Sequence, residues 1–190
     1  MATVRSGDKA ALLVLDVQVG VMRGTWDEAR IASNIVRAVE RAREAGLPVI
    51  WVQHTDADLP HASREWQWIP NLVPAEGEVR IEKAHNSAFE DTSLDAELAK
   101  LGVSHIVLAG AATNWCVRAT AYAALERGYD LTLLSDAHTT EHMEAEDDTL
   151  IAAPCVVQDL NIVLRWLTYP GRRSRVRTVD EMGGDLRSSA

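Results

Sequence analysis

The sequence predicts an α/β fold with three layers, α/β/α, around a mostly parallel central sheet of Rossmann-like topology. Two observations predict it. Short apolar runs typical of strands buried on both faces recur along the chain, and segments of helical period alternate with them. The 190 residues, 47% hydrophobic and 25% charged, suffice for one domain with its own core. We expect a single domain over residues 1–190, with residues 170–190 as a polar, loosely held C-terminal tail.

The first half of the chain contains three predicted strands, which cover residues 10–15, 48–52 and 79–82. A helix is predicted over residues 27–45, because apolar side chains recur there at three- and four-residue spacing and Gly46 provides a stop. Residues 53–77 are rich in proline, histidine, tryptophan and acids. An irregular segment of this length inside a compact domain usually carries function.

The second half continues the alternation. Helices are predicted over residues 91–100, 115–127 and 154–167, and strands over residues 105–109 and 129–134. A helix between two strands allows the chain to cross over and keep neighbouring strands parallel. In open sheets of this kind, ligands bind beyond the carboxyl ends of the strands. The residues that directly follow the strands are therefore the first candidates for a functional site.

Three side chains of complementary chemistry stand at such strand ends. Asp16 follows the first predicted strand, Lys83 follows the third, and Cys116 opens the helix after the fourth. A helix N-terminus and a nearby ammonium both favour the thiolate form of a cysteine. A carboxylate within reach can take the thiol proton and later return it to a leaving group. Each residue alone has a structural interpretation, but their shared place at one sheet edge favours a cysteine nucleophile.

At these residues the sequence resembles the isochorismatase-like cysteine hydrolases, which include nicotinamidases, N-carbamoylsarcosine amidase, and ureidoacrylate and biuret hydrolases. The matching segments surround the three residues and two later strand ends. They are residues 12–18, Lys83 with residues 86–89, residues 108–117, Gly128 with Tyr129, and residues 135–137. The resemblance extends from about Lys9 to Arg177 and implies an isochorismatase-like α/β fold.

The resemblance also implies roles. Asp16 matches the family's general base and acid, Lys83 its active-site lysine, and Cys116 its nucleophile. A cis peptide would join Ala111 to Ala112, and the backbone N–H groups of Ala112 and Cys116 would form the oxyanion hole. The implied reaction is hydrolysis of a C–N bond in a small amide or ureide through a cysteine thioester. Which amide or ureide is cleaved is left open.

One departure from the family concerns metal binding. Nicotinamidases of this family hold a metal with an Asp-x-His pair after the second strand, and that order is absent here. His54, Asp56 and His61 have donor groups suited to a metal, but their spacing differs from the family's. We therefore expect no metal and no cofactor, with His54 orienting the loop.

The tryptophans near the predicted site have two interpretations each. Trp66 and Trp68, in the long loop, either form an apolar wall of the substrate pocket or anchor the loop. Trp115, beside the nucleophile, either lines the pocket or packs beneath it. Of the remaining chemistry-bearing residues, Cys155 is expected in the core beside two valines, and His138 is expected on the polar surface.

Charge and cysteine content restrict the partners and the compartment. A net charge of −9 argues against nucleic acid as a partner, and no apolar run approaches the length of a membrane span. Two cysteines without a signal peptide suggest a reducing cytoplasm. The acids of residues 141–148 and the five arginines of residues 165–177 suit contacts between copies, so we expect a homo-oligomer, a dimer or tetramer.

Two alternative functions stay open. The first is an isochorismate-type vinyl-ether hydrolase, although members of that type need no cysteine nucleophile. The second is a noncatalytic domain that binds a dinucleotide or senses redox state through Cys116, although Gly110 stands without the further glycines of a dinucleotide-binding loop. A hydrolase should have a thiol whose reactivity depends on Asp16 and Lys83. A noncatalytic domain of either kind should not.

Overall fold

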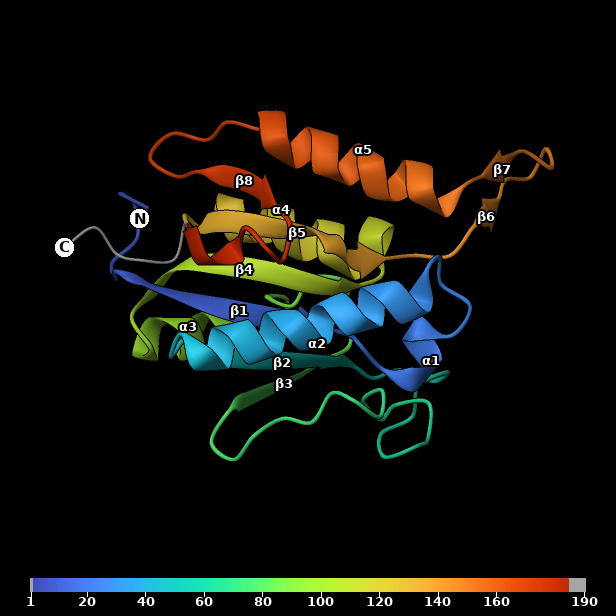
Figure 1. The fold of residues 1–190 in the computed structure, drawn as a ribbon, viewed down its shortest axis with the longest axis horizontal. Helices are drawn as coiled ribbons and strands as arrows, with labels where there is room; N and C mark the ends of the chain where they lie inside the picture. Colours follow the sequence, from blue (N-terminus) through green and yellow to red (C-terminus); the bar gives the residue numbers. More distant parts are fainter. Residues whose placement is uncertain (1, 185–190) are drawn as a thin grey trace.

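The computed structural model describes residues 2–184 and confirms the predicted fold class (Figure 1). Six strands form one sheet in the order β3-β2-β1-β4-β5-β8, and every neighbouring pair is parallel. The strands are β1 (Lys9–Leu15), β2 (Val49–His54), β3 (Val79–Lys83), β4 (Val103–Ala111), β5 (Asp130–Thr139) and β8 (Ser174–Arg177). The helices are α1 (Val19–Met22), α2 (Glu28–Glu44), α3 (Leu94–Lys100), α4 (Arg118–Glu126) and α5 (Ala153–Trp166). A small antiparallel pair, β6 (Met143–Glu144) and β7 (Leu150–Ile151), stands apart from the sheet.

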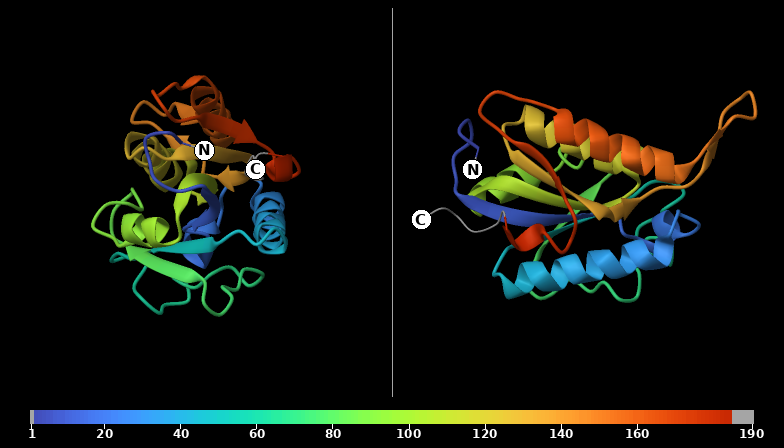
Figure 2. Two further views of the ribbon diagram at one scale, coloured as in Figure 1. Left: turned by 90° about the vertical axis from the view of Figure 1, so that its left-hand side faces the viewer. Right: turned by 45° about the horizontal axis from the view of Figure 1, so that its top comes forward.

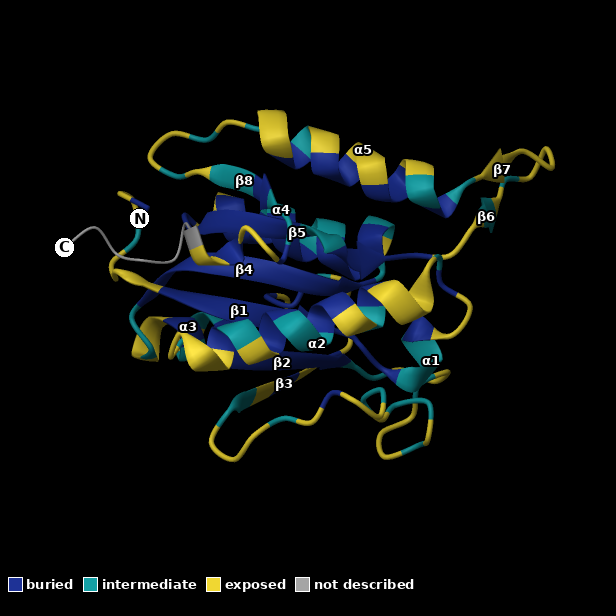
Figure 3. Ribbon diagram, viewed as in Figure 1, coloured by how far each residue is buried: buried dark blue, intermediate teal, exposed yellow. Residues whose placement is uncertain are grey.

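Helices cover both faces of the sheet, as three layers require (Figure 2). Helix α2 packs on one face and α3, α4 and α5 on the other, which gives two separate apolar cores. Strand β1 contributes to both, because Leu13 and Leu15 face one core while Leu12 and Val14 face the other. This double burial explains the unbroken apolar run in the sequence. The four central strands, β2, β1, β4 and β5, are almost wholly buried, whereas the outer helix faces are exposed (Figure 3).

The strand order reverses beside β1, and this reversal places the carboxyl ends of β1 and β4 next to each other. Leu15 pairs with Gly110 in the register of the two strands. Gly110 has φ of 138°, and a side-chain carbon there would lie 2.0 Å from the carbonyl oxygen of Leu15. Only glycine permits this approach. The two strands therefore approach each other closely at the end where the predicted site lies.

The structure corrects the expected C-terminal tail. Residues Ser174–Arg177 form β8, which pairs with residues Leu131–Leu134 of β5 at the edge of the sheet. Its one apolar side chain, Val176, is buried, and the alternating arginines around it conceal the strand in the sequence. The last part of the expected tail, residues 185–190, lies outside the described residues.

Two further expectations differ from the structure. The predicted helix from Trp115 begins instead as a π-helical turn, Thr113–Val117, which passes into α4. Cys155 is exposed on α5, because the buried face of that helix is formed by residues such as Val156 and Val157, and Cys155 lies outside it. Within residues 2–184, no helix combines the length and apolarity that crossing a membrane requires.

Candidate active site

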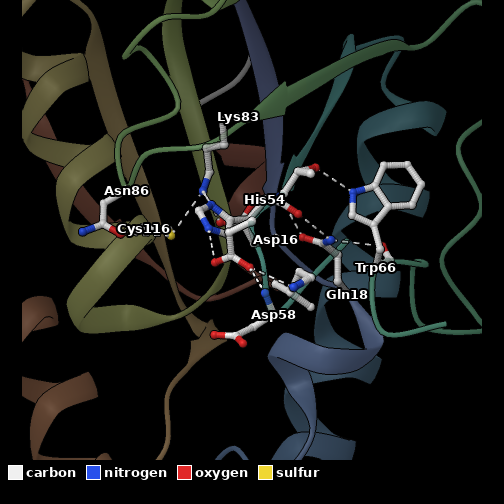
Figure 4. A network of polar contacts seen from close by, with 11 residues as sticks. Asp16, Gln18, His54, Asp58, Trp66, Lys83, Asn86 and Cys116 are labelled. Atoms are coloured by element: carbon white, nitrogen blue, oxygen red, sulfur yellow. Dashed lines mark hydrogen bonds and ion pairs between the residues drawn. The ribbon is translucent and has the colours of Figure 1, made fainter. Parts of the chain in front are cut away.

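The three predicted residues come from three strand ends and meet at one point (Figure 4). Asp16 follows β1 in a left-handed conformation, with φ of 53°, and its N–H donates to the carbonyl of Val52 at 2.9 Å. Lys83 is the last residue of β3, and Cys116 lies in the π-helical turn after β4. The prediction that these residues share one sheet edge is confirmed.

The Lys83 ammonium is the centre of the cluster. Its Nζ lies 2.6 Å from Asp16 Oδ2, 3.2 Å from Cys116 Sγ and 3.2 Å from His54 Nδ1. The Lys83 side chain is 0% exposed and that of Asp16 is 1% exposed. Since an ammonium carries three hydrogens and no acceptor, these three neighbours match its full donor capacity. A buried charge requires such compensation.

Burial governs the protonation of the acid and the thiol. Desolvation raises the pKa of Asp16 above its usual value, and the nearby Lys83 opposes that rise. Desolvation and then the charge of Asp16 raise the pKa of Cys116 to about 12, again opposed by Lys83. Cys116 is therefore a thiol at neutral pH. To act as a nucleophile it must lose its proton during the reaction, and Asp16 is the acceptor at hand.

His54 completes the surroundings of Lys83, a contact that sequence reasoning missed. Its Nε2 lies 2.9 Å from Asp56 Oδ2. A carboxylate only accepts, so we assign the ring proton to Nε2, which leaves Nδ1 to accept from Lys83. The backbone of His54 is held by Gln18, whose Oε1 accepts from its N–H at 2.8 Å and whose Nε2 donates to its carbonyl at 3.0 Å. The residues that would meet a metal are thus engaged elsewhere.

The third member of the possible metal site, His61, contacts other side chains. His61 Nε2 lies 3.2 Å from Glu82 Oε1, and its ring packs against Trp66 at 4.5 Å between centroids. Among residues 2–184, no three histidine, cysteine, aspartate or glutamate side chains converge as a metal-binding group. These donors do not fit a resident metal.

The tryptophans differ in what they contact. Trp68 stacks edge-on against the buried Trp51 at 5.1 Å between centroids, the contact expected of a loop anchor. Trp66 donates from Nε1 to Thr55 Oγ1 at 2.9 Å, and its carbonyl accepts from Gln18 at 3.0 Å. Trp115 is 56% exposed beside the nucleophile. Of the three, Trp115 alone is largely exposed, and it directly precedes Cys116 in the chain.

The π-helical turn that contains Cys116 is stabilised by backbone hydrogen bonds on both sides of that residue. The Ala111–Ala112 peptide is cis, as the resemblance implies, and the carbonyl of Ala112 accepts from the N–H groups of Trp115 and Val117, both at 3.1 Å. Asn86 Oδ1 stands 4.0 Å from Cys116 Sγ, on the open side of the thiol. Sequence matching placed Asn86 in a shared segment but gave it no role.

His138 is the clearest error of sequence reasoning. It was expected on the polar surface, yet it is 0% exposed and its ring lies between two polar side chains. Its Nδ1 is 2.9 Å from Thr113 Oγ1, and its Nε2 is 3.1 Å from Asn161 Oδ1. Only the pairing of β4 with β5, in which Gly110 lies opposite His138, brings it beneath the turn.

Comparisons with known proteins identify the family to which the chain belongs. Residues 10–158 match the isochorismatase domain model. The chain is 33% identical over 154 residues to streptothricin hydrolase of Streptomyces noursei, covering 77% of this chain and 55% of that one. It is 28% identical over 141 residues to ureidoacrylate amidohydrolase RutB of Caulobacter vibrioides, covering 57% and 63%. It thus spans less than two thirds of either relative.

A solved structure gives the same result for the fold. The crystal structure of an isochorismatase from Pseudomonas putida KT2440 superposes with a TM-score of 0.82 at 28% identity, over 92% of this chain and 90% of that one. The shared fold and the match to the family model, which covers most of the sequence, establish that this chain belongs to the isochorismatase family.

Proposed function

We propose that this protein is a cysteine hydrolase that cleaves the C–N bond of a small amide or ureide through a thioester on Cys116. One observation carries the proposal: a buried ammonium, Lys83, contacts both a carboxylate and a thiol sulfur. A buried ion pair is costly to a fold, and its presence against a cysteine suits catalysis better than stability. The relatives named as hydrolases support the same reaction class.

The first half-reaction forms the thioester. Asp16 takes the proton of the Cys116 thiol as the sulfur attacks the carbonyl carbon, and an S–C bond forms. The N–H groups of Ala112 and Cys116 receive the oxyanion of the tetrahedral intermediate. Protonated Asp16 then gives its proton to the leaving nitrogen as the C–N bond breaks. Ammonia or an amine departs and the acyl group stays on sulfur.

The second half-reaction restores the enzyme. Asp16, again a carboxylate, takes a proton from a water molecule as the water oxygen attacks the thioester carbon. The C–S bond breaks, the sulfur recovers a proton from Asp16, and the acid leaves. Lys83 stabilises the charged states of Asp16 and Cys116 throughout, because its ammonium lies within hydrogen-bond distance of both side chains and of His54.

The test combines a thiol probe with turnover. Intact mass after iodoacetamide treatment is compared among the wild type, Cys116→Ala, Asp16→Asn and Cys155→Ser, and ammonia release is measured over a panel of amides and ureides. We expect an adduct on Cys116 that forms as Asp16 takes the thiol proton, is lost in Cys116→Ala and is slowed in Asp16→Asn, and we expect ammonia from at least one panel member. Labelling confined to the exposed Cys155, with no turnover, would refute the proposal.

Compartment and assembly belong to the same proposal. A reducing cytoplasm keeps Cys116 as the thiol that the mechanism starts from. A homo-oligomer would pair the acidic hairpin around β6 and β7 with arginines of a second copy. Light scattering after size exclusion, in 0.1 and 1 M salt, measures this directly: a mass of one chain at both salt concentrations would contradict it.

A further inference from the structure

We infer that His138, held by Asn161, is a positioning residue for the nucleophile: as a neutral imidazole it accepts a hydrogen bond from the Thr113 hydroxyl and thereby fixes the turn that carries Cys116. The inference rests on the proposed function, because positioning matters here only if Cys116 reacts. His138 itself does not touch the sulfur, so it acts through Thr113.

Three fully or nearly buried polar side chains form a chain of contacts beneath the site. Thr113 and His138 are 0% exposed and Asn161 is 4% exposed. They come from three elements: the π-helical turn, β5 and α5. Polar groups buried without water must find partners within the protein, and these three find them in one another. The arrangement ties the turn to the sheet and to the outer helix layer.

The outer partner determines where each proton lies. Asn161 Nδ2 donates to the carbonyl of Ser135 at 3.3 Å, which directs its Oδ1 toward His138. An amide oxygen only accepts, so Nε2 of His138 carries the ring proton. Nδ1 is then an acceptor, and the Thr113 hydroxyl donates to it. The direction of all three contacts thus follows from one backbone carbonyl.

The neutral state of His138 agrees with this assignment. Burial lowers the pKa of His138 to about 4, and the opposing influence is the hydrogen bond with Asn161. No charged side chain of residues 2–184 contributes to that pKa shift. An imidazolium would donate from both nitrogens and could not accept from Thr113.

The consequence reaches Cys116 through a short, constrained backbone. Thr113 opens the turn, and the next residue, Asn114, accepts at Oδ1 from Thr140 Oγ1 at 2.6 Å. Two consecutive residues of the turn are therefore attached to the end of β5 and its extension. Cys116 follows two residues later, so loss of the Thr113 attachment releases the side of the turn nearest the cis peptide. A displacement of about 1 Å in a reacting group lowers rates about 10²-fold.

The experiment changes the two partners of His138, Thr113 and Asn161, with little change in side-chain size. Thr113→Val removes the hydroxyl and Thr113→Ser keeps it. Asn161→Asp places a carboxylate against His138, which favours the imidazolium and reverses the bond to Thr113. Asn34→Asp is the matched control, since Asn34 is also buried and donates to a backbone carbonyl, that of Asp136, at 2.7 Å, but has no link to Thr113.

Three measurements are made on folded protein, with thermal unfolding as the check on each variant. They are the ¹⁵N shifts of the His138 ring, the rate of Cys116 alkylation, and kcat and KM on an amide that the wild type cleaves. We expect an Nε2–H tautomer in the wild type. We expect kcat to fall about 10- to 100-fold in Thr113→Val with KM changed less than about threefold, and Thr113→Ser to stay within about threefold.

The pH profile separates positioning from simple damage. In Asn161→Asp we expect kcat and the alkylation rate to be low while His138 is protonated and to recover at higher pH, whereas Asn34→Asp shows no such recovery. Combining Thr113→Val with Asn161→Asp should cost no more than the larger single effect. Equal activity of Thr113→Val and Thr113→Ser, or an Nδ1–H tautomer, would overturn the inference. An unreactive wild-type Cys116 would instead overturn the proposed function and leave the tautomer result standing.

Discussion

A charged cluster lies at each end of the strands, one at the amino ends and one at the carboxyl ends, and the two clusters are built differently. At the amino ends of the strands, Arg5 Nη2 pairs with Asp95 Oδ1 at 2.6 Å. Arg5 Cζ lies 3.9 Å from the centroid of the Tyr129 ring, and the Tyr129 hydroxyl donates to the same carboxylate at 2.9 Å. The Arg5 and Asp95 side chains are 20% and 50% exposed. At the carboxyl ends, Asp16 and Lys83 are almost completely buried.

The difference shows what each cluster does. The charges of the amino-end cluster stay in contact with water, so their pairing has little desolvation cost. The carboxyl-end cluster removes a carboxylate and an ammonium from water and leaves Asp16 Oδ1 without a hydrogen-bond partner among residues 2–184. A fold selected for stability alone would favour apolar residues there. The cost is understandable if Asp16 must be ready to accept a proton.

The largest difference between the clusters should appear when the cation is removed from each. We expect Lys83→Met to lower kcat on the order of 10³-fold and to destabilise the fold by about 3 kcal/mol, because Asp16 stays buried without its counter-charge. Arg5→Met, the control, should cost about 1 kcal/mol or less and leave kcat unchanged. Urea unfolding and ammonia release measure both, and equal destabilisation would remove the contrast.

Removing both charges at the carboxyl edge sharpens the same point. We expect Asp16→Asn combined with Lys83→Met to regain most of the stability lost in Lys83→Met, about 2 kcal/mol, while remaining inactive. Stability and activity would then separate within one pair of residues. If the double variant is less stable than Lys83→Met, the pair stabilises the fold and the argument from cost fails.

Alkaline pH should weaken the carboxyl edge through the thiol. The folded pKa of Cys116, raised to about 12, lies above that of the unfolded chain, so its contribution to stability is complete below the unfolded pKa and is lost as pH rises toward 12. In that window the free energy of unfolding of the wild type should fall by about 1.4 kcal/mol per pH unit more than that of Cys116→Ala. Urea unfolding of both proteins at pH 8.5, 9.5 and 10.5 gives the difference. Parallel curves would mean that the thiol pKa is ordinary.

The smallest effects belong to the amino edge and the outer surface. Tyr129→Phe removes one hydrogen bond to a partly exposed carboxylate and should cost about 1 kcal/mol with kcat unchanged. Cys155→Ser, on the exposed side of α5, should stay within about 0.5 kcal/mol of the wild type. Thermal unfolding ranks the two. A loss of activity in either would show that function extends beyond the carboxyl edge.

The sequence was sufficient to predict five of the six strands of the sheet and the meeting of Asp16, Lys83 and Cys116. Buried parallel strands leave continuous apolar runs, and parallel strands bring their carboxyl ends to one edge, so both follow from local patterns. The same patterns fail where a residue's surroundings depend on distant segments. Val176 between arginines becomes a buried strand residue only because β5 offers an edge to pair with.

The wrong predictions for His138 and Cys155 have the same cause. His138 is polar and lies after a predicted strand, and nothing near it in the sequence announces Thr113 or Asn161, which are 25 and 23 residues away. Cys155 lies in an apolar stretch, but the face of α5 that meets the sheet is set by Val156, Val157 and their helical neighbours. Such contacts require the register of β4 with β5 and the rotation of α5, which the sequence does not encode locally.

The way the long loop is fastened bears on how this fold can diversify. The loop between β2 and β3 is held at the carbonyl of Trp66, which accepts from Gln18 at 3.0 Å and from Gln53 at 2.9 Å. A backbone carbonyl is supplied by every amino acid, so the attachment makes no demand on the side chain at that position. The side chains of the loop can therefore change by mutation while Gln18 and Gln53 keep their hydrogen bonds to it. Such changes leave in place the two hydrogen bonds by which Gln18 also holds the backbone of His54.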